Sequence, residues 1–196
     1  MATDVSKVVI ANLALSHLGK AKINSLSQAG AEATNANLFY PFARRSTLAK
    51  ASWGFARARV IAGELTATWT ERYEYAYQPP TDAVRIWRVT DALDPRWQDP
   101  ADFPEMMDGA IHTNLSGARV FYIKDIDDPT KYTNGFVLTM AATLAAMLAI
   151  PLTRNSKLAD TWRKEAAREL SQAISETQND LINRNEKDAD WIEARS

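Results

Sequence analysis

The run FVLTMAATLAAMLAIPL, residues 136–152, limits the fold of this chain more than any other stretch. It carries no charged residue, and it is rich in alanine and threonine. A helix that crosses a membrane needs roughly 20 strongly apolar residues, and this run is shorter and ends at a proline. We therefore interpret it as the buried central helix of a helical core, and we expect no membrane contact.

Three further helices are expected, over residues 5–18, 31–62 and 156–182. In the first, apolar residues cover most of the circumference, so that helix should be largely buried, and Gly19 is a plausible stop. In the second, large apolar residues recur at helical spacing, although Pro41 should kink or restart it. In the last, apolar residues recur every three or four positions beside a charged face, which indicates one buried and one solvated side. Asn155 or Ser156 can cap that helix.

The middle of the chain follows a different pattern. From about residue 66 to residue 126, short runs such as YEYAYQ, AVRIWRV and ARVFYIKDI alternate apolar and polar positions, as strands do. Prolines between the runs indicate loops. The sequence thus predicts an α+β, mainly α fold, with a four-helix bundle-like core and an inserted small antiparallel β subdomain. We expect the bundle over 1–64 and 127–184, the insertion over 65–126, and a C-terminal tail over 185–196.

Charge and residue usage offer little for chemistry. The chain has 23 Lys and Arg against 24 Asp and Glu, no cysteine and two histidines. No phosphate-binding glycine loop is present, and the acidic run DIDDPTKY lacks the glycine and final glutamate of an EF-hand. His17 is a candidate general base, but no carboxylate or nucleophile lies beside it in sequence, so we expect a structural role. No catalytic motif is therefore convincing, and we expect no cofactor and no metal.

Two sets of residues can serve as contacts. Arg44, Arg45, Arg57 and Arg59 give the second helix a basic side, which is either a phosphate-contacting patch or a solvated face. The charged tail contains Trp191 and Ile192, and it either frays or anchors in the groove of a partner. Asn12 is the polar exception of the first helix, and we expect its amide to bond across to another helix or loop.

Four segments together resemble one family. They are IANLALSHLGKAKINSL, ANLFYPFARRSTLAKASWGFARARV, YEYAYQPPTDAVRIWRV, and the stretch from DGAIHTNLSGARVFYIKDIDD through the Ala-rich run. Their succession is similar to the head-to-tail adaptor proteins of tailed bacteriophages, the group that includes the tail tubular protein A of short-tailed phages.

The resemblance implies a structural virion protein at the head–tail interface, assembled in the host cytoplasm. Twelve copies would form a ring that docks on the portal protein, extends the DNA channel and supports the next tail or nozzle protein. It implies no enzyme activity, and only transient, non-specific contact with passing DNA.

The resemblance also assigns roles to residues. The tail would reach the portal, so Trp191, Ile192 and Arg195 are candidate portal contacts. The four arginines would face the channel or a neighbouring subunit. Trp53 and Phe55 would close the second helix, and we expect them, with Leu13 and Trp162, in the structural core.

Two other functions stay open. One is a DNA-interacting packaging or regulatory factor that uses the basic face of the second helix, and the other is a small hydrolase whose site the sequence does not reveal.

Overall fold

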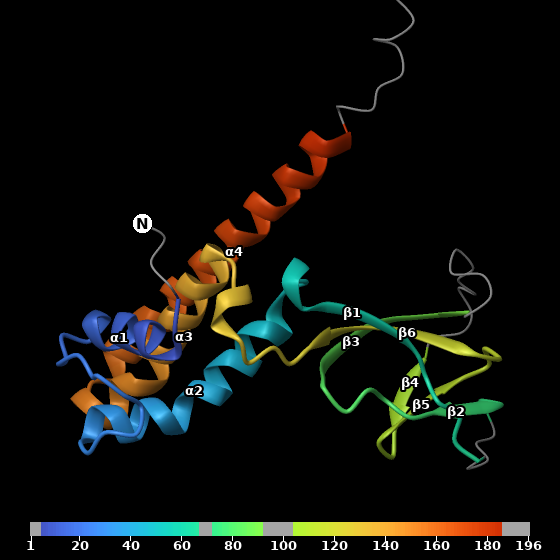
Figure 1. Ribbon diagram of the computed structural model, residues 1–196, viewed down its shortest axis with the longest axis horizontal. Coiled ribbons are helices and arrows are strands. Elements are labelled where there is room, and N and C mark those ends of the chain that lie inside the picture. The colour runs from blue at the N-terminus through green and yellow to red at the C-terminus, as the bar shows by residue number, and fades with distance from the viewer. Residues whose placement is uncertain (1–4, 67–71, 92–103, 186–196) are drawn as a thin grey trace, which may run out of the picture. The chain divides into compact units, whose positions relative to one another are not determined.

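The computed structural model describes residues 5–66, 72–91 and 104–185, with side chains described as far as residue 176. The fold is α+β and mainly α, with four long helices and two small antiparallel sheets, as the sequence predicts (Figure 1). By their contacts, the residues divide into a helical unit, Met1–Thr47 with Asp128–Ser196, and a β unit, Leu48–Asp127. The β unit is therefore an insertion in the helical chain, and it begins before the residue 65 at which we placed its start.

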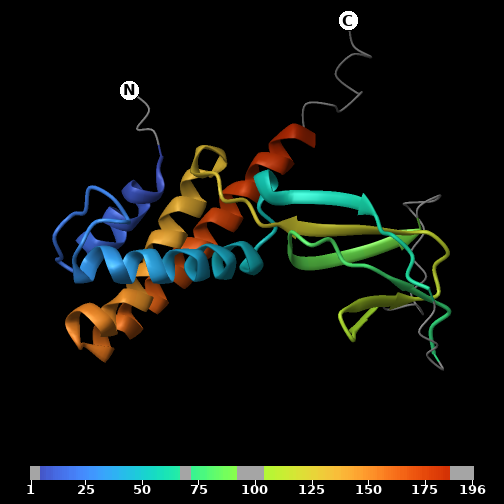
Figure 2. The ribbon, with the colours of Figure 1, turned by 60° about the horizontal axis from the view of Figure 1, so that its bottom comes forward.

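The elements follow one another along the chain in the order seen in the colours of Figures 1 and 2. They are α1 (Lys7–His17), α2 (Ala31–Lys50), β1 (Arg57–Ile61), β2 (Tyr75–Tyr77), β3 (Ala83–Asp91), β4 (Glu105–Met107), β5 (Ala110–Thr113), β6 (Ala118–Lys124), α3 (Asn134–Thr153) and α4 (Ser156–Asn185).

The prediction of one helix over residues 31–62 is wrong beyond residue 50. Helix α2 ends at Lys50, a short 3-10 turn covers Gly54–Ala56, and Arg57–Ile61 form strand β1. The sequence RARVI alternates charged and apolar residues, and its β-branched end suits a strand that can pair with β6. Pro41 lies inside α2 without ending it.

Helix α3 is the centre of the helical unit. It packs against both α1 and α4, and these neighbours bury residues on nearly every side of it. By length and composition it could cross a membrane, but two thirds of its most apolar window, 67%, is buried within the protein. The helix continues through Pro151 to Thr153, and Arg154 closes it in the left-handed conformation with φ 53°.

Local side chains fix the ends of these helices. The Ser6 hydroxyl accepts a hydrogen bond from the Val9 N–H at 3.2 Å at the start of α1, and the Asn155 amide oxygen accepts from the Leu158 N–H at 3.1 Å at the start of α4. Each satisfies a helix N–H that has no partner within the helix.

The β unit contains two three-stranded antiparallel sheets, in the orders β1-β6-β3 and β2-β5-β4. A hydrophobic core joins them, because Val120 and Tyr122 of β6 cluster with Tyr77 of β2 and Ile111 of β5. The buried Tyr77 hydroxyl is satisfied twice: it donates to the Leu115 carbonyl and accepts from the Gly117 N–H, both at 2.7 Å.

Candidate functional site: an arginine-lined sheet face

The outer face of the first sheet is built by strand alternation. On β6, Ala118, Val120 and Tyr122 point into the core of the β unit, so Arg119, Phe121 and Ile123 point the other way. Residues directly opposite one another in a sheet share a face. In the register, Arg57 of β1 and Arg85 of β3 both pair with Ile123, and Arg59 pairs with Phe121.

A bulge in β3 adds further side chains to this face. The register shifts between Ile86 and Arg88, which leaves Trp87 as an extra residue opposite Phe121. The Trp87 and Phe121 rings are 5.6 Å apart, and the Arg88 guanidinium lies 5.7 Å from the centre of the Phe121 ring. We call this surface the arginine face: Arg57, Arg59, Arg85, Arg88, Arg119, Trp87, Phe121 and Ile123.

A hollow of about 300 Å³ lies at the Arg57 end of this face. Ser52, Arg57, Arg85, Trp87 and Ile123 line it, and we call it the arginine pocket. A second hollow, of about 260 Å³, is lined by Arg59 and Arg119 with Val60 and Ile61. Both hollows thus have two arginines in their walls.

Backbone and hydroxyl groups hold the pocket arginines in place. The Arg57 Nε donates to the Ser52 hydroxyl at 3.0 Å, and its Nη2 donates to the Ser52 carbonyl at 3.1 Å. The Arg85 Nη1 donates to the Ala49 carbonyl at 3.2 Å. Within the described ranges no carboxylate pairs with either guanidinium, so both retain unused donors beside the hollow.

This geometry corrects the expected basic side of the second helix. Arg44 and Arg45 lie on α2, where Arg44 is buried and Arg45 is exposed. Arg57 and Arg59 are exposed on β1. The four residues therefore do not share a helix face, because a strand begins where the helix was expected to continue.

The other expected residues lie elsewhere. Trp53 is buried, with 5% of its surface exposed, whereas Phe55, Leu13 and Trp162 are half-buried. Trp162 of α4 stacks on His17 of α1, with ring centres 4.1 Å apart. Burial lowers the pKa of His17, and the nearby Glu165 and Glu169 oppose that shift. Trp191, Ile192 and Arg195 lie outside the described residues.

The sequence alone does not identify five residues of the arginine face: Arg85, Arg88, Arg119, Trp87 and Phe121. The alternation in AVRIWRV indicates that Arg85 and Trp87 lie on one side of a strand. It does not indicate their neighbours, because only the strand order β1-β6-β3 brings them beside Arg57 and Arg59.

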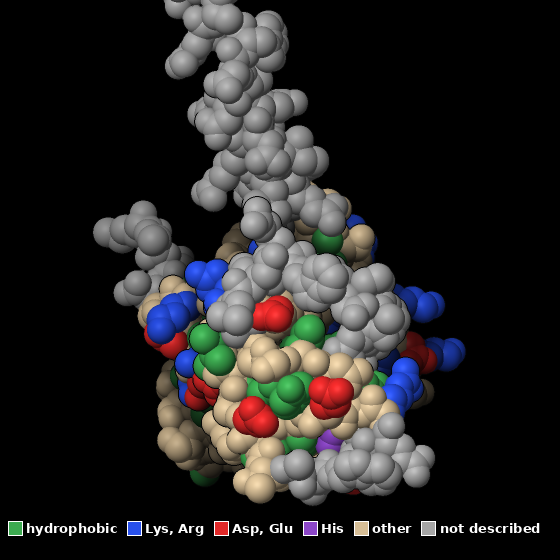
Figure 3. Space-filling model, turned by 90° about the vertical axis from the view of Figure 1, so that its right-hand side faces the viewer, with side chains coloured by type: hydrophobic (Ala, Val, Ile, Leu, Met, Phe, Trp, Pro, Cys, Tyr) green, Lys and Arg blue, Asp and Glu red, His purple; other side chains and the backbone are tan. Residues whose placement is uncertain are grey.

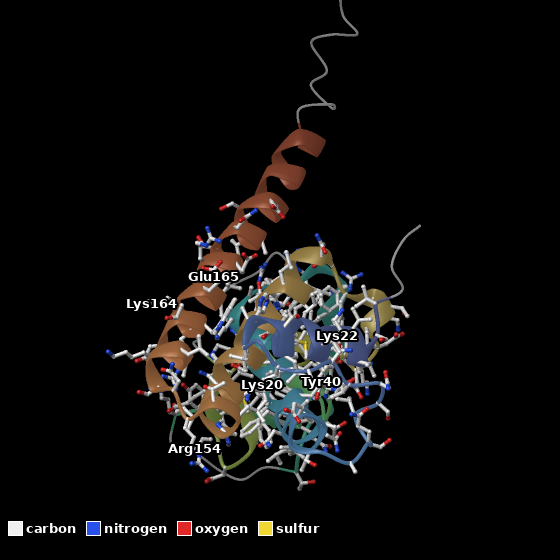
Figure 4. The ribbon with its side chains drawn as sticks, turned by 90° about the vertical axis from the view of Figure 1, so that its left-hand side faces the viewer. Lys20, Lys22, Tyr40, Arg154, Lys164 and Glu165 are labelled. Atoms are coloured by element: carbon white, nitrogen blue, oxygen red, sulfur yellow. The ribbon has the colours of Figure 1, made fainter. Side chains whose placement is uncertain are left out.

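Some cations of the described helical unit lie apart from one another. Figure 4 shows Lys20, Arg154 and Lys164 projecting from different parts of this unit, with Lys164 pointing away from the neighbouring helices. Among the residues that the structure describes, no group of three His, Cys, Asp or Glu side chains could hold a metal ion.

No protein-family model matches this sequence, and no curated protein matches it.

Proposed function

We propose that this chain is the subunit of a head-to-tail adaptor ring of a tailed bacteriophage. The observation that carries the proposal is the insertion of a small β unit between α2 and α3 of a helical unit, because this is the organisation that the resemblance of the four sequence segments implies. In this role the protein docks on the portal, extends the DNA channel and supports the next tail component.

A cyclic ring needs two different surfaces on each subunit, which meet head to tail between neighbours. The described residues offer exposed surfaces of different kinds in each unit. On α2, Leu38 and Phe42 are 57% and 62% exposed and lie one helical turn apart. On the β unit, the arginine face provides a charged surface.

The test is the mass of the purified protein by light scattering, alone and after mixing with the portal ring of the same phage. We expect a stoichiometric portal complex that carries a ring of this chain. Absence of any complex across a range of salt concentrations would reject the adaptor role.

One observation favours a second candidate, a DNA-interacting packaging or regulatory factor. Arginines interleaved with Trp87 and Phe121 on an open sheet face are a combination that also suits nucleic acid, since arginines can pair with phosphates and aromatic rings can stack on bases. This candidate now rests on the sheet and no longer on the second helix. Fluorescence anisotropy with labelled DNA would test it: binding that weakens steeply with salt and is lost in Arg57→Glu/Arg85→Glu would favour it over the adaptor role.

A further inference from the structure

Three arginines of the arginine face carry positive charge that no carboxylate among the described residues balances. Arg57, Arg59 and Arg85 are exposed, and no carboxylate of the described residues forms an ion pair with any of them. A hollow with two guanidiniums, the Trp87 ring and the Ile123 side chain in its walls has the chemistry to hold an anionic group on an apolar stem.

The same unit carries the opposite charge on its second sheet. Glu74, Glu105 and Asp108 are exposed on or beside the sheet β2-β5-β4, and no described cation forms an ion pair with them. We call these three residues the acidic surface, and Figure 3 shows acidic side chains set around hydrophobic ones at this end of the β unit.

The two surfaces point away from each other. The arginine face is the side of the first sheet opposite the core that joins it to the second sheet. In the second sheet, Met106 pairs with the core residue Ile111, so the preceding residue, Glu105, points to the side away from that core. Because the surfaces lie on opposite sides, one molecule cannot bring them together, whereas two molecules arranged head to tail can.

We propose that the arginine pocket is a carboxylate-binding site, and that the carboxylate comes from the acidic surface of a second copy of this chain. Repetition of this contact from copy to copy joins the β units of neighbouring molecules. This inference rests on the proposed function in one respect, because both need copies of the chain to associate. It adds which surfaces of neighbouring β units would be in contact in the ring.

The shape of the pocket favours a side-chain carboxylate over a phosphate backbone. Arg57 and Arg85 lie on strands that flank β6, and they converge on one hollow whose apolar lining is the Trp87 ring, 44% exposed, and the buried Ile123. A glutamate or aspartate can place one carboxylate between two guanidiniums while its methylene groups contact the Trp87 ring. A nucleic-acid backbone is instead bound by cations spread along its path.

The test is a charge swap between two variants. The first variant carries Arg57→Glu with Arg85→Glu, and the second carries Glu105→Arg with Asp108→Arg. Each alone presents two surfaces of the same sign, so we expect its self-association, measured by sedimentation, to weaken by about 100-fold relative to the wild type. Mixed in equal amounts, the variants again present opposite charges, so association should return. Lys157→Glu with Lys164→Glu is the matched control for the arginine variant, since it makes the same change in charge on exposed positions of α4.

Disulfide trapping gives a second readout, which captures the contact covalently even where the association is weak. The chain has no cysteine, so a variant with Arg59→Cys and Glu105→Cys has only these two thiols. If the surfaces meet between copies, mild oxidation should give a ladder of covalent oligomers on a non-reducing gel. The pair Lys157→Cys with Glu105→Cys should give none.

The outcomes separate this inference from the proposed function. If rings form on the portal equally well with and without the arginine substitutions, the inference is wrong and the adaptor role stands. If the wild type associates through these surfaces and never binds a portal, the inference stands and the adaptor role falls. A wild type that stays monomeric both alone and with the portal overturns both. If the arginine substitutions abolish DNA binding and leave self-association unchanged, nucleic acid is the occupant of the pocket and the inference is overturned.

Discussion

The Asn12 side chain ties α1 to the loop that follows it. Its Nδ2 donates to the Ile23 carbonyl at 2.9 Å, and its Oδ1 accepts from the Ile23 N–H at 2.8 Å. One side-chain amide thus satisfies both backbone groups of Ile23, a buried residue in the loop after α1. This confirms the expectation that the polar exception in an apolar helix must bond across to another segment.

We expect Asn12→Ala to lower the free energy of unfolding by about 1–3 kcal/mol, because it leaves two backbone groups of Ile23 without partners. Asn12→Asp should also destabilise the protein, since it replaces the Nδ2 donor with an oxygen that faces the Ile23 carbonyl. Urea denaturation measures both. Asn37→Ala, at an exposed position of α2, is the control. Equal midpoints for Asn12→Ala and this control would contradict the assignment.

The pairing of His17 with Trp162 makes stability depend on pH. Burial lowers the pKa of His17 in the folded protein, and the carboxylates Glu165 and Glu169 reduce that effect. Below the ordinary histidine pKa of about 6.5, the unfolded chain therefore takes up a proton more readily than the folded chain does. Stability should fall as the pH drops from 7.5 through 6.5, until the lowered pKa of the folded state is passed.

The measurement is the free energy of unfolding of the wild type and His17→Gln at several pH values in this window. The free energy of unfolding of the variant should fall less with decreasing pH than that of the wild type, because glutamine does not titrate. Parallel pH profiles for the two proteins would show that His17 contributes nothing to the dependence.

At the scale of elements, the close approach of α3 and α4 depends on a residue without a side chain. A Cβ added to Gly135 would lie 2.7 Å from the Cβ of Ala173 and 3.4 Å from its Cα. No flexible side-chain end is available to move aside. Gly135 is therefore a packing requirement at the start of α3, although alanine is the better helix former.

Gly135→Ala should destabilise the protein by about 1–3 kcal/mol through overpacking, despite its favourable helix propensity. Adding Ala173→Gly should recover part of the loss, since it removes the methyl group that clashes. Gly54→Ala is the control, because a Cβ there meets nothing within 4 Å. Thermal unfolding followed by circular dichroism decides the point: a melting temperature at or above that of the wild type would contradict the clash.

Trp53 lies where the chain leaves α2 and enters β1. It is 5% exposed, and its ring centre is 6.4 Å from that of Phe55. Trp53→Ala should cost about 3 kcal/mol, since the cavity it leaves adds to the lost burial. Phe55→Ala should cost less, because Phe55 is only half-buried. An unchanged melting curve for Trp53→Ala would reject this role.

At the scale of the whole molecule, the chain combines two compact units of different composition. The helical unit is built around the apolar α3, whereas the β unit carries the arginine face and the acidic surface. The net charge of −1 conceals this separation of charge. A balanced total can therefore coexist with local surfaces suited to a partner of opposite sign.

Deletion of Asn185–Ser196 tests the proposed portal contact of Trp191, Ile192 and Arg195. We expect the truncated chain to keep the melting temperature of the full chain and to lose its association with the portal ring in light scattering, because the anchoring side chains are gone. Trp191→Ala in the full chain is the narrower version of the experiment. Portal binding that survives the deletion would place the contact elsewhere on the chain.

The sequence by itself determined the helical core, the strands β2, β3 and β6 and the buried state of α3, but not the strands β4 and β5. These features follow from the periodicity of apolar residues and from long apolar runs, which are local properties of each segment. It also determined that Val120 and Tyr122 lie on one face of β6 and Phe121 and Ile123 on the other, whereas the structure shows that the Val120 face meets the core shared with the second sheet.

Only the tertiary structure decided that residues 57–61 are a strand and that the arginine face exists. A short segment such as RARVI can continue a helix or pair with a strand, and its pairing with β6, a strand much later in the chain, selects the strand. Strand order is a long-range property, so the convergence of Arg57 and Arg85 on one hollow across Ile123 cannot be read from either segment alone.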